Sequence, residues 1–413
     1  MYDPDLMEFM DDESLLSAFA KIDAHAGSRE VIREELTRRN LVPITTPPDR
    51  EGSATPRERS RRPGERHGAR LDHGIAGPGH GCSGVKSMSP SVLPLPPDWY
   101  PESLAVTSDG VFYVGSWRHG AIARISAPDW TPQIIVAPGS QGLANVQGVM
   151  IDEPRGLLWV CSSDYGLTTV PVTPSALKSF DLDSGRARSS YPWPGGGHCN
   201  DLILCPDGTI LVTDTKKPRI LQLRPGARAL EDWLEHPSLG GGGPLCLNGI
   251  AMDDSGDVIV APFHPVDYLL RVRRRSDGSA GAVERLFVPR TLRNADAIRW
   301  LGDEQVLICE SDVSGGGAHG GSVTVATIDE GRIVSLRTIA NGLVDPASAV
   351  VFRDRAYYVE TKYRLLMDHR HDPGAIVSDV PFCIQSTLLS EGNAMRRQGE
   401  WPDRQNVAGE DRA

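Results

Sequence analysis

The sequence predicts an all-β fold, a six-bladed β-propeller with four-stranded blades, and three observations support this prediction. The 43 glycines and 32 prolines make up 75 of the 413 residues, about 18%, which implies many turns and disfavours a long helical bundle. A unit made of an apolar stretch, an acidic or glycine turn and a β-rich stretch occurs six times. The copies start 45 to 53 residues apart, a period typical of propeller blades.

The regions outside the repeats differ from them in composition. Residues 1–42 carry apolar side chains at helical spacing and are predicted to form a short helical segment. Residues 43–95 are rich in Pro, Gly and Arg, which predicts a flexible linker. We therefore expect the propeller to span residues 96–388, after a small, partly helical or disordered N-terminal extension and before a disordered tail at 389–413.

Each copy supplies two or three recognisable strands. The first has an apolar stretch at 103–106, the turn Ser108-Asp109-Gly110 and a β-rich stretch at 111–114. The corresponding pairs in the later copies are 148–151 and 157–160, 201–204 and 209–212, 249–252 and 257–260, 297–300 and 305–308, and 348–351 and 355–359. A third strand is predicted at 121–125, 219–223 and 268–272. A linear β-solenoid is the alternative, but its period is usually shorter and its ends need capping, so a closed ring is favoured.

Charge and composition exclude several classes of protein. The net charge of -11 disfavours nucleic acid as a partner. The chain has no run of 18 apolar residues that would predict a membrane span. Its acidic first 13 residues do not resemble a signal peptide, so a cytoplasmic location is expected. The seven cysteines are scattered without a Cys-x-x-Cys pair. This indicates buried reduced thiols rather than a zinc knuckle or a disulfide framework.

Polar residues start the apolar stretch of most copies. In a propeller this place lies at one mouth of the central channel, so the six residues there should meet in space. They are Glu102, Gln147, Asn200, Asn248, Asp296 and Ala347. Carboxylates and amides around one axis make a hard-oxygen site for a divalent cation, and the predicted ligands are Glu102, Asn200, Asn248 and Asp296. Ca²⁺ is the best match, with Mg²⁺, Mn²⁺ or Zn²⁺ as alternatives.

These residues also have a simpler interpretation. Asn200-Asp201 and Asn248-Gly249 are ordinary turn dipeptides, and each alone indicates a turn more often than a ligand. The recurrence of oxygen-bearing side chains at the same place in four copies favours the shared metal site.

The stretch from about 96 to 388 resembles the six-bladed propellers of the regucalcin (senescence marker protein), gluconolactonase and luciferin-regenerating enzyme family, and more distantly the paraoxonases. The resemblance rests on Pro101-Glu102, Asn200-Asp201, Asn248-Gly249 and Asp296, in that order. It implies that Glu102, Asn248 and Asp296 hold the metal, and that Asn200 contacts the metal or the substrate. The family often has glycine where this chain has Ser103 and Ala297. Sugar lactonases of the regucalcin type carry an arginine where this chain has His198, so gluconolactone specificity is not expected.

The expected activity is metal-dependent hydrolysis of a lactone or related ester. A divalent ion would polarise the carbonyl while an activated water attacks it. The resemblance implies Asp296 as the base. His198 is a second candidate because imidazole titrates near neutral pH, although it could equally be a loop histidine bonded to a carbonyl.

A small-molecule substrate, a lactone or an ester, should contact residues at the same mouth of the channel. The predicted substrate-binding residues are the anchor Gln147 and loop residues between second and third strands, namely Trp117, His119, Tyr165 and His264.

Two other functions stay open at this point. The chain could be a non-catalytic propeller that binds a ligand or a partner and uses the metal as a structural pin. It could also catalyse an isomerisation or a condensation, because function is set by the site and not by the fold.

Overall fold

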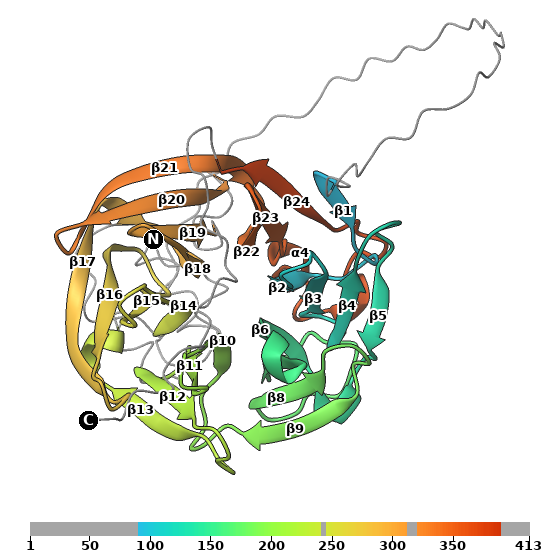
Figure 1. Ribbon diagram of the computed structural model, residues 1–413. Coiled ribbons are helices and arrows are strands. Elements are labelled where there is room, and N and C mark those ends of the chain that lie inside the picture. The colour runs from blue at the N-terminus through green and yellow to red at the C-terminus, as the bar shows by residue number, and fades with distance from the viewer. Residues whose placement is uncertain (1–89, 241–244, 312–319, 390–413) are drawn as a thin grey trace, which may run out of the picture.

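The structure confirms the predicted six-bladed β-propeller of four-stranded antiparallel blades (Figure 1). It is a computed structural model that describes residues 90–240, 245–311 and 320–389. The predictions for residues 1–42, for 43–89 of the linker and for 390–413 of the tail lie outside these ranges. In the described part no helix has the length and apolar content needed to cross a membrane.

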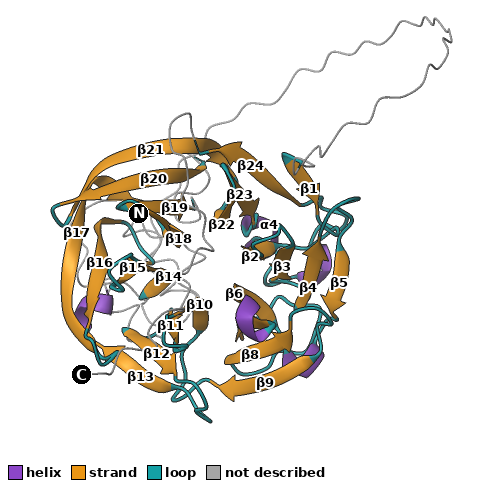
Figure 2. Ribbon diagram, in the orientation of Figure 1, coloured by secondary structure: helices purple, strands orange, loops and turns teal. Residues whose placement is uncertain are grey.

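The strands of each blade follow one another from the channel outwards (Figure 2). The innermost strands are β2 (Pro101–Val106), β6 (Asn145–Asp152), β10 (Cys199–Leu204), β14 (Leu247–Met252), β18 (Ala295–Gly302) and β22 (Pro346–Phe352). The second strands are β3 (Phe112–Ser116), β7 (Leu157–Ser163), β11 (Ile210–Asp214), β15 (Val258–Pro262), β19 (Gln305–Glu310) and β23 (Arg355–Glu360).

The third strands include the predicted segments at 121–125 and 219–223 with the expected bounds. They are β4 (Ala121–Ile125), β8 (Ala176–Asp181), β12 (Arg219–Leu223), β16 (Val266–Arg274), β20 (Gly321–Asp329) and β24 (Cys383–Leu388). The outer strands are β5 (Gln133–Val136), β9 (Ala187–Pro192), β13 (Glu231–Glu235), β17 (Ala280–Leu292), β21 (Arg332–Leu343) and β1 (Val92–Pro94). Short helical turns are η1 (Ser140–Gly142), η2 (Glu153–Arg155), η3 (Pro237–Gly240), α4 (Arg364–Met367) and η5 (Pro373–Ala375).

The ring is closed by the first and last strands of the described chain. Strand β1 pairs antiparallel with β24 and becomes the outer strand of the last blade, so residues about 290 positions apart share one sheet. Strand β1 falls inside the range 43–95 that is predicted to be a linker. The propeller therefore begins at Val92 rather than at 96. The sequence could not predict this pairing, because β1 has only three residues and lies outside the repeats.

The core lies between neighbouring blades, and the strands are built for burial on both faces. In β15, Val258 and Val260 pack in the cluster shared with the third blade, while Ile259 and Ala261 pack against the fifth. All four side chains are fully buried. Because successive side chains of a strand point to opposite faces, a strand covered on both faces needs a continuous apolar run. Each large buried side chain contributes about 1.5–3 kcal/mol of transfer free energy.

Every innermost strand departs from regular pairing near its first residue. The register with the second strand shifts between Pro101 and Leu104 in the first blade, and at the matching place in the other five blades. A bulge leaves extra residues unpaired and redirects their side chains. Glycine permits the close packing that results, because a Cβ on Gly148 or Gly249 would lie 2.4–2.5 Å from a backbone oxygen of the next blade. The bulges therefore place the predicted ligand positions at the channel axis.

A disulfide joins the second and third blades, which corrects the expectation that all cysteines are reduced thiols. Cys161 on β7 and Cys199 on β10 are bonded, with their Cα atoms 5.1 Å apart, and both are fully buried. Cys205, Cys246, Cys309 and Cys383 are free thiols. Sequence spacing could not find the bridge because the two cysteines are 38 residues apart and belong to different repeats.

Replacing Cys161 with Ser is expected to lower the free energy of unfolding by about 3–4 kcal/mol, because the unfolded chain regains the freedom of the loop that the bridge closes. Denaturant unfolding without reductant measures the change. Cys246→Ser is the matched control, since Cys246 is buried but unbridged. Equal losses for the two variants, or a non-reducing peptide map without a Cys161–Cys199 link, would contradict the assignment.

Candidate functional site

Five of the six predicted anchor residues meet at the axis of the propeller. Glu102, Asn200, Asn248, Asp296 and Ala347 line one cavity, although they come from five different blades. The wall is completed by the residues that directly follow the anchors, namely Ser103, Gly148, Asp201, Ala297 and Ser348. Arg299, two residues after Ala297 on β18, also lines it. The cavity has a volume of about 10 Å³, about the space of a single water or ion. This is below the usual 300–1,000 Å³ of a small-molecule site, so it suits an ion or a water rather than a whole substrate.

Glu102 and Asp296 carry unbalanced negative charge in this cavity. Their exposed fractions are 5% and 3%. The pKa of Glu102 is raised well above its usual value by burial and by the charges of Asp296 and Asp201. The pKa of Asp296 is raised likewise, by burial and by Asp201. The ionised carboxylates therefore destabilise the cavity unless a cation or protons neutralise them.

The one arginine that lines the cavity is already paired. Arg299 Nη1 lies 2.6 Å from Asp201 Oδ2, which joins the third and fifth blades across the channel. Asp201 also accepts hydrogen bonds from the backbone of Leu202 and Ile250. Sequence reasoning missed this pair. The available signal was a charged residue, Arg299, inside the apolar run of an innermost strand.

The two asparagines have oxygen atoms to offer a cation. Asn200 Nδ2 donates to Thr215 Oγ1 at 2.7 Å, which leaves the amide oxygen free for the cavity. The Asn248 amide hydrogen-bonds the Asp296 carboxylate. Among the described residues no group of three or more His, Cys, Asp or Glu side chains is arranged to hold a metal, so an ion here would depend on amide oxygens as well. Such a donor set fits Ca²⁺ better than Zn²⁺, which prefers nitrogen and sulfur.

Gln147 lies beside the cavity and not in its wall. Its amide nitrogen donates to Glu102 Oε1 at 2.9 Å, and its oxygen accepts from Trp117 Nε1 at 2.8 Å. The sequence analysis expected Gln147 and Trp117 to contact substrate. In the structure both are almost fully buried, with exposed fractions of 2%, and together they orient Glu102.

Aromatic and hydroxyl side chains continue this support to Asn200. The Trp117 ring stacks on the Tyr165 ring with centroids 6.1 Å apart, and Tyr165 hydrogen-bonds Thr215. The Thr215 hydroxyl in turn accepts from Asn200. A continuous arc therefore connects the two anchors Glu102 and Asn200 around one side of the mouth. The sequence does not indicate this role for Thr215, apart from its position directly after the second strand of its blade.

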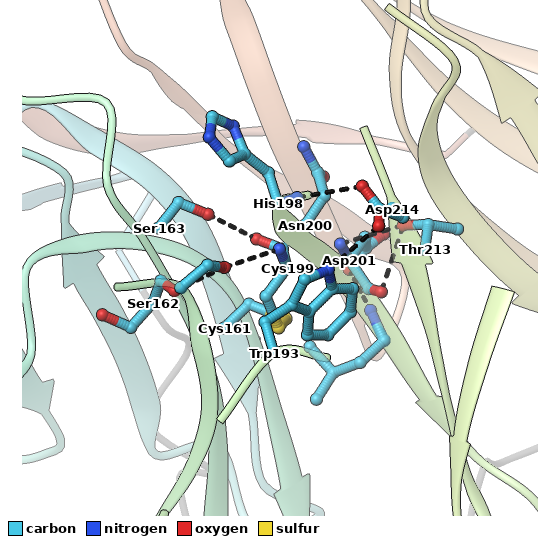
Figure 3. Close-up of a disulfide and its surroundings, with 12 residues drawn as sticks. Cys161, Ser162, Ser163, Trp193, His198, Cys199, Asn200, Asp201, Thr213 and Asp214 are labelled. Atoms are coloured by element: carbon cyan, nitrogen blue, oxygen red, sulfur yellow. Dashed lines mark hydrogen bonds between the residues drawn. A yellow bond between two sulfur atoms is a disulfide. The ribbon is translucent and has the colours of Figure 1, made fainter. Parts of the chain in front are cut away.

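His198 stands at the same mouth, next to Asn200. Figure 3 shows the two side chains extending from one side of β10, while Cys199 extends from the other into the disulfide. His198 Nε2 lies 2.7 Å from Asp164 Oδ1, and its ring packs edge-on against Tyr165 at 4.1 Å. The hydrogen bond from His198 holds the pKa of Asp164 below its ordinary value. Nδ1 of His198 is buried and has no hydrogen-bond partner among the described residues.

The backbone around His198 is fixed by one buried carboxylate. Asp214 at the end of β11 accepts hydrogen bonds from the His198 backbone nitrogen at 2.9 Å and from Trp193 Nε1 at 2.9 Å. It also pairs with Arg219 Nε at 2.9 Å. Asp214 is fully buried, so these bonds hold the segment before β10 rigidly.

Two predicted substrate-binding residues do not line the cavity. His119 bonds Thr169 Oγ1 through Nδ1 at 2.9 Å and packs near Trp99, with ring centroids 6.2 Å apart. Burial and Arg118 lower the pKa of His119. His264 lies in the loop between β15 and β16 and is half-buried. Neither residue belongs to the wall of the cavity.

Thr215→Val should lower the free energy of unfolding by about 1–3 kcal/mol, because the buried Asn200 amide and Tyr165 hydroxyl lose their shared partner while the shape is kept. Thr215→Ser is the matched control: it keeps the hydroxyl and loses only one methyl group, at a cost of about 1 kcal/mol. Urea unfolding of both variants measures the difference. A serine variant less stable than the valine variant would show that the hydroxyl does not hold the arc.

Comparisons with known proteins find only distant similarities. No protein-family model matches it, and no curated protein matches it. One similar solved structure is a protein provisionally described as a gluconolactonase, with 15% identity, a TM-score of 0.46 and coverage of 73% of this chain and 97% of that one. Others are the PQQ-bound aldose sugar dehydrogenase of Streptomyces coelicolor (12%, TM-score 0.45, coverage 72% and 98%) and virginiamycin B lyase of Staphylococcus aureus (12%, TM-score 0.44, coverage 72% and 99%).

Proposed function

We propose that the chain is a divalent-metal-dependent hydrolase that acts on a lactone or related ester at the mouth of the propeller channel. The observation that carries the proposal is the pair of buried carboxylates, Glu102 and Asp296, that face one ion-sized cavity in which the described residues place no unpaired arginine or lysine. Asn200 and Asn248 add neutral oxygens, which makes a mixed carboxylate and amide site of the kind that Ca²⁺ accepts. Glu102, Asn200, Asn248 and Asp296 would hold the ion, as the sequence analysis expected.

The bound ion would supply Lewis-acid stabilisation of the charge that develops on the substrate carbonyl oxygen. The chain's own residues would do the rest. Gln147 and Thr215 keep Glu102 and Asn200 in place, so the ligands need little rearrangement. The cavity is too small for a substrate, which would therefore lie above it, near Tyr165 and His198.

We assign the proton acceptor to His198 rather than to Asp296. Asp296 is hydrogen-bonded to Asn248 and would be occupied by the ion. His198 holds Asp164 through Nε2 and keeps Nδ1 for a proton, and the Asp164 carboxylate would stabilise the imidazolium that forms. This arrangement of a histidine oriented by a carboxylate is the usual design of a general base.

Metal binding can be tested without a substrate. We expect purified protein to bind one divalent ion, and Ca²⁺ at about 100 times its Kd to add about 2.7 kcal/mol to the free energy of unfolding. Glu102→Gln should abolish this gain and at the same time stabilise the metal-free protein, because the raised pKa shows that ionised Glu102 opposes folding. Asp183→Asn, at an exposed turn, is the control and should change neither quantity. The proposal would be contradicted if neither chelators nor added metal changed the free energy of unfolding.

Catalysis is tested by a panel of lactones and esters of differing ring size and alkyl tail, with Ca²⁺ present. For the best substrate, His198→Gln should lower kcat about 10²-fold or more while leaving metal affinity unchanged, because the residue moves a proton and binds no ion. Asp164→Asn should act in the same direction. Absence of turnover by the metal-loaded wild-type protein across the panel would favour a non-catalytic, ligand-binding propeller.

A further inference from the structure

A second cavity lies at the opposite end of the propeller from the anchor residues. It is formed between the second and third blades, where β6 ends at Asp152, and by the turn after β12 that contains Arg224. Its volume is about 170 Å³, which is below the usual 300–1,000 Å³ of a small-molecule site but about that of a cavity that holds one benzene-sized ring. None of the residues assigned to the proposed metal site takes part in it.

One wall of this second cavity is aromatic. Trp159 on β7 and Tyr191 on β9 have ring centroids 6.1 Å apart, with their planes inclined by 30°. Trp159 is only 7% exposed, so its ring is held firmly in the cluster between the blades. Aromatic side chains held in this way favour stacking or edge contacts with another ring.

The rim of the cavity carries more positive than negative charge. Arg155 pairs with Asp152, with Nη1 and Oδ2 2.9 Å apart, and half of its side chain stays exposed. Arg224 approaches only the neutral Gln222, at 3.4 Å, and forms no ion pair within the described part of the chain. The lining thus has two guanidinium groups for one carboxylate, in a chain whose net charge is -11. A planar guanidinium is suited to bind a carboxylate through two hydrogen bonds.

Two buried polar atoms of the lining residues have no hydrogen-bond partner. They are Trp159 Nε1 and Asp152 Oδ1, and Asp152 is 1% exposed. By contrast, the indole nitrogens of Trp233 and Trp300 donate to Gly278 and Asp254 at 2.9 Å. Of the two, Trp159 Nε1 is a donor that a ligand carboxylate can satisfy, whereas Asp152 Oδ1 is an acceptor that a carboxylate cannot satisfy.

We propose that this cavity is a second ligand site, which binds a small planar aromatic carboxylate. The ring lies against Trp159 and Tyr191, and the carboxylate is held by Arg224 with help from Arg155. The site acts independently of the proposed hydrolase activity, because it lies between the second and third blades and shares no residue with the anchor cavity.

Titration of the full chain with naphthalene-2-carboxylate, followed by calorimetry, tests the proposal. Saturable one-to-one binding is expected. Arg224→Gln should weaken it up to about fivefold, the loss expected for one exposed ion pair. Arg228→Gln is the matched control, because Arg228 is an exposed arginine of the same turn outside the cavity. The neutral naphthalene-2-carboxamide should bind wild type more weakly and should not distinguish Arg224→Gln from wild type.

The location is checked by the indole N–H signals in a ¹H–¹⁵N spectrum. The Trp159 signal, identified by its loss in Trp159→Phe, should shift during the titration, while that of Trp300 should not. Three results would overturn the proposal: no saturable binding, equal weakening by Arg224→Gln and Arg228→Gln, or binding that leaves the Trp159 signal unmoved.

Discussion

Closure of the ring is the constraint on which the rest of the structure depends. Strand β1 is only three residues long, yet it completes the last blade, and Leu93 is fully buried. The bonds continue past the strand, because Leu95 donates to Phe382 and the Asp98 carboxylate accepts from the backbone of Asp379 and Val380. A closed ring leaves only short strand edges facing the channel and fixes six innermost strands about one axis. Glu102 and Asp296, which are 194 positions apart, can share a cavity only because of this closure.

The axis is also where the molecule departs most from the rules that stabilise a core. Between the blades, apolar side chains pack on both faces of each strand, whereas the axis holds Glu102, Asp201, Asp296 and Arg299. Only Asp201 is balanced by an arginine. Buried charges without partners cost free energy that hydrophobic residues at these positions would avoid. Local violations of this kind are expected at functional sites and are paid for elsewhere.

The sequence predicts the fold and the anchor positions well, because both follow from a repeat in which each blade has the same register. It predicts contacts between repeats poorly. Three of these contacts join different blades, so no local sequence pattern predicts them. They are the disulfide, the ion pair of Asp201 and Arg299, and the hydrogen bond from Gln147 to Glu102. The sequence does not predict the bulges at the starts of the innermost strands either, although these bulges direct the anchor side chains. His119 and His264 do not line the cavity, and their contact with a substrate above it stays a prediction.

The exchange of arginine for His198, relative to the family that the sequence resembles, has an electrostatic consequence. An arginine would add a permanent positive charge near the two uncompensated carboxylates. Histidine adds one only when it is protonated, and here it is already bound to the partly exposed Asp164. When both carboxylates are ionised and no ion occupies the cavity, the mouth would carry a net negative charge that repels an anionic substrate. A neutral lactone or ester meets no such barrier, and the half-buried Tyr165 ring offers it apolar surface close to the proposed base.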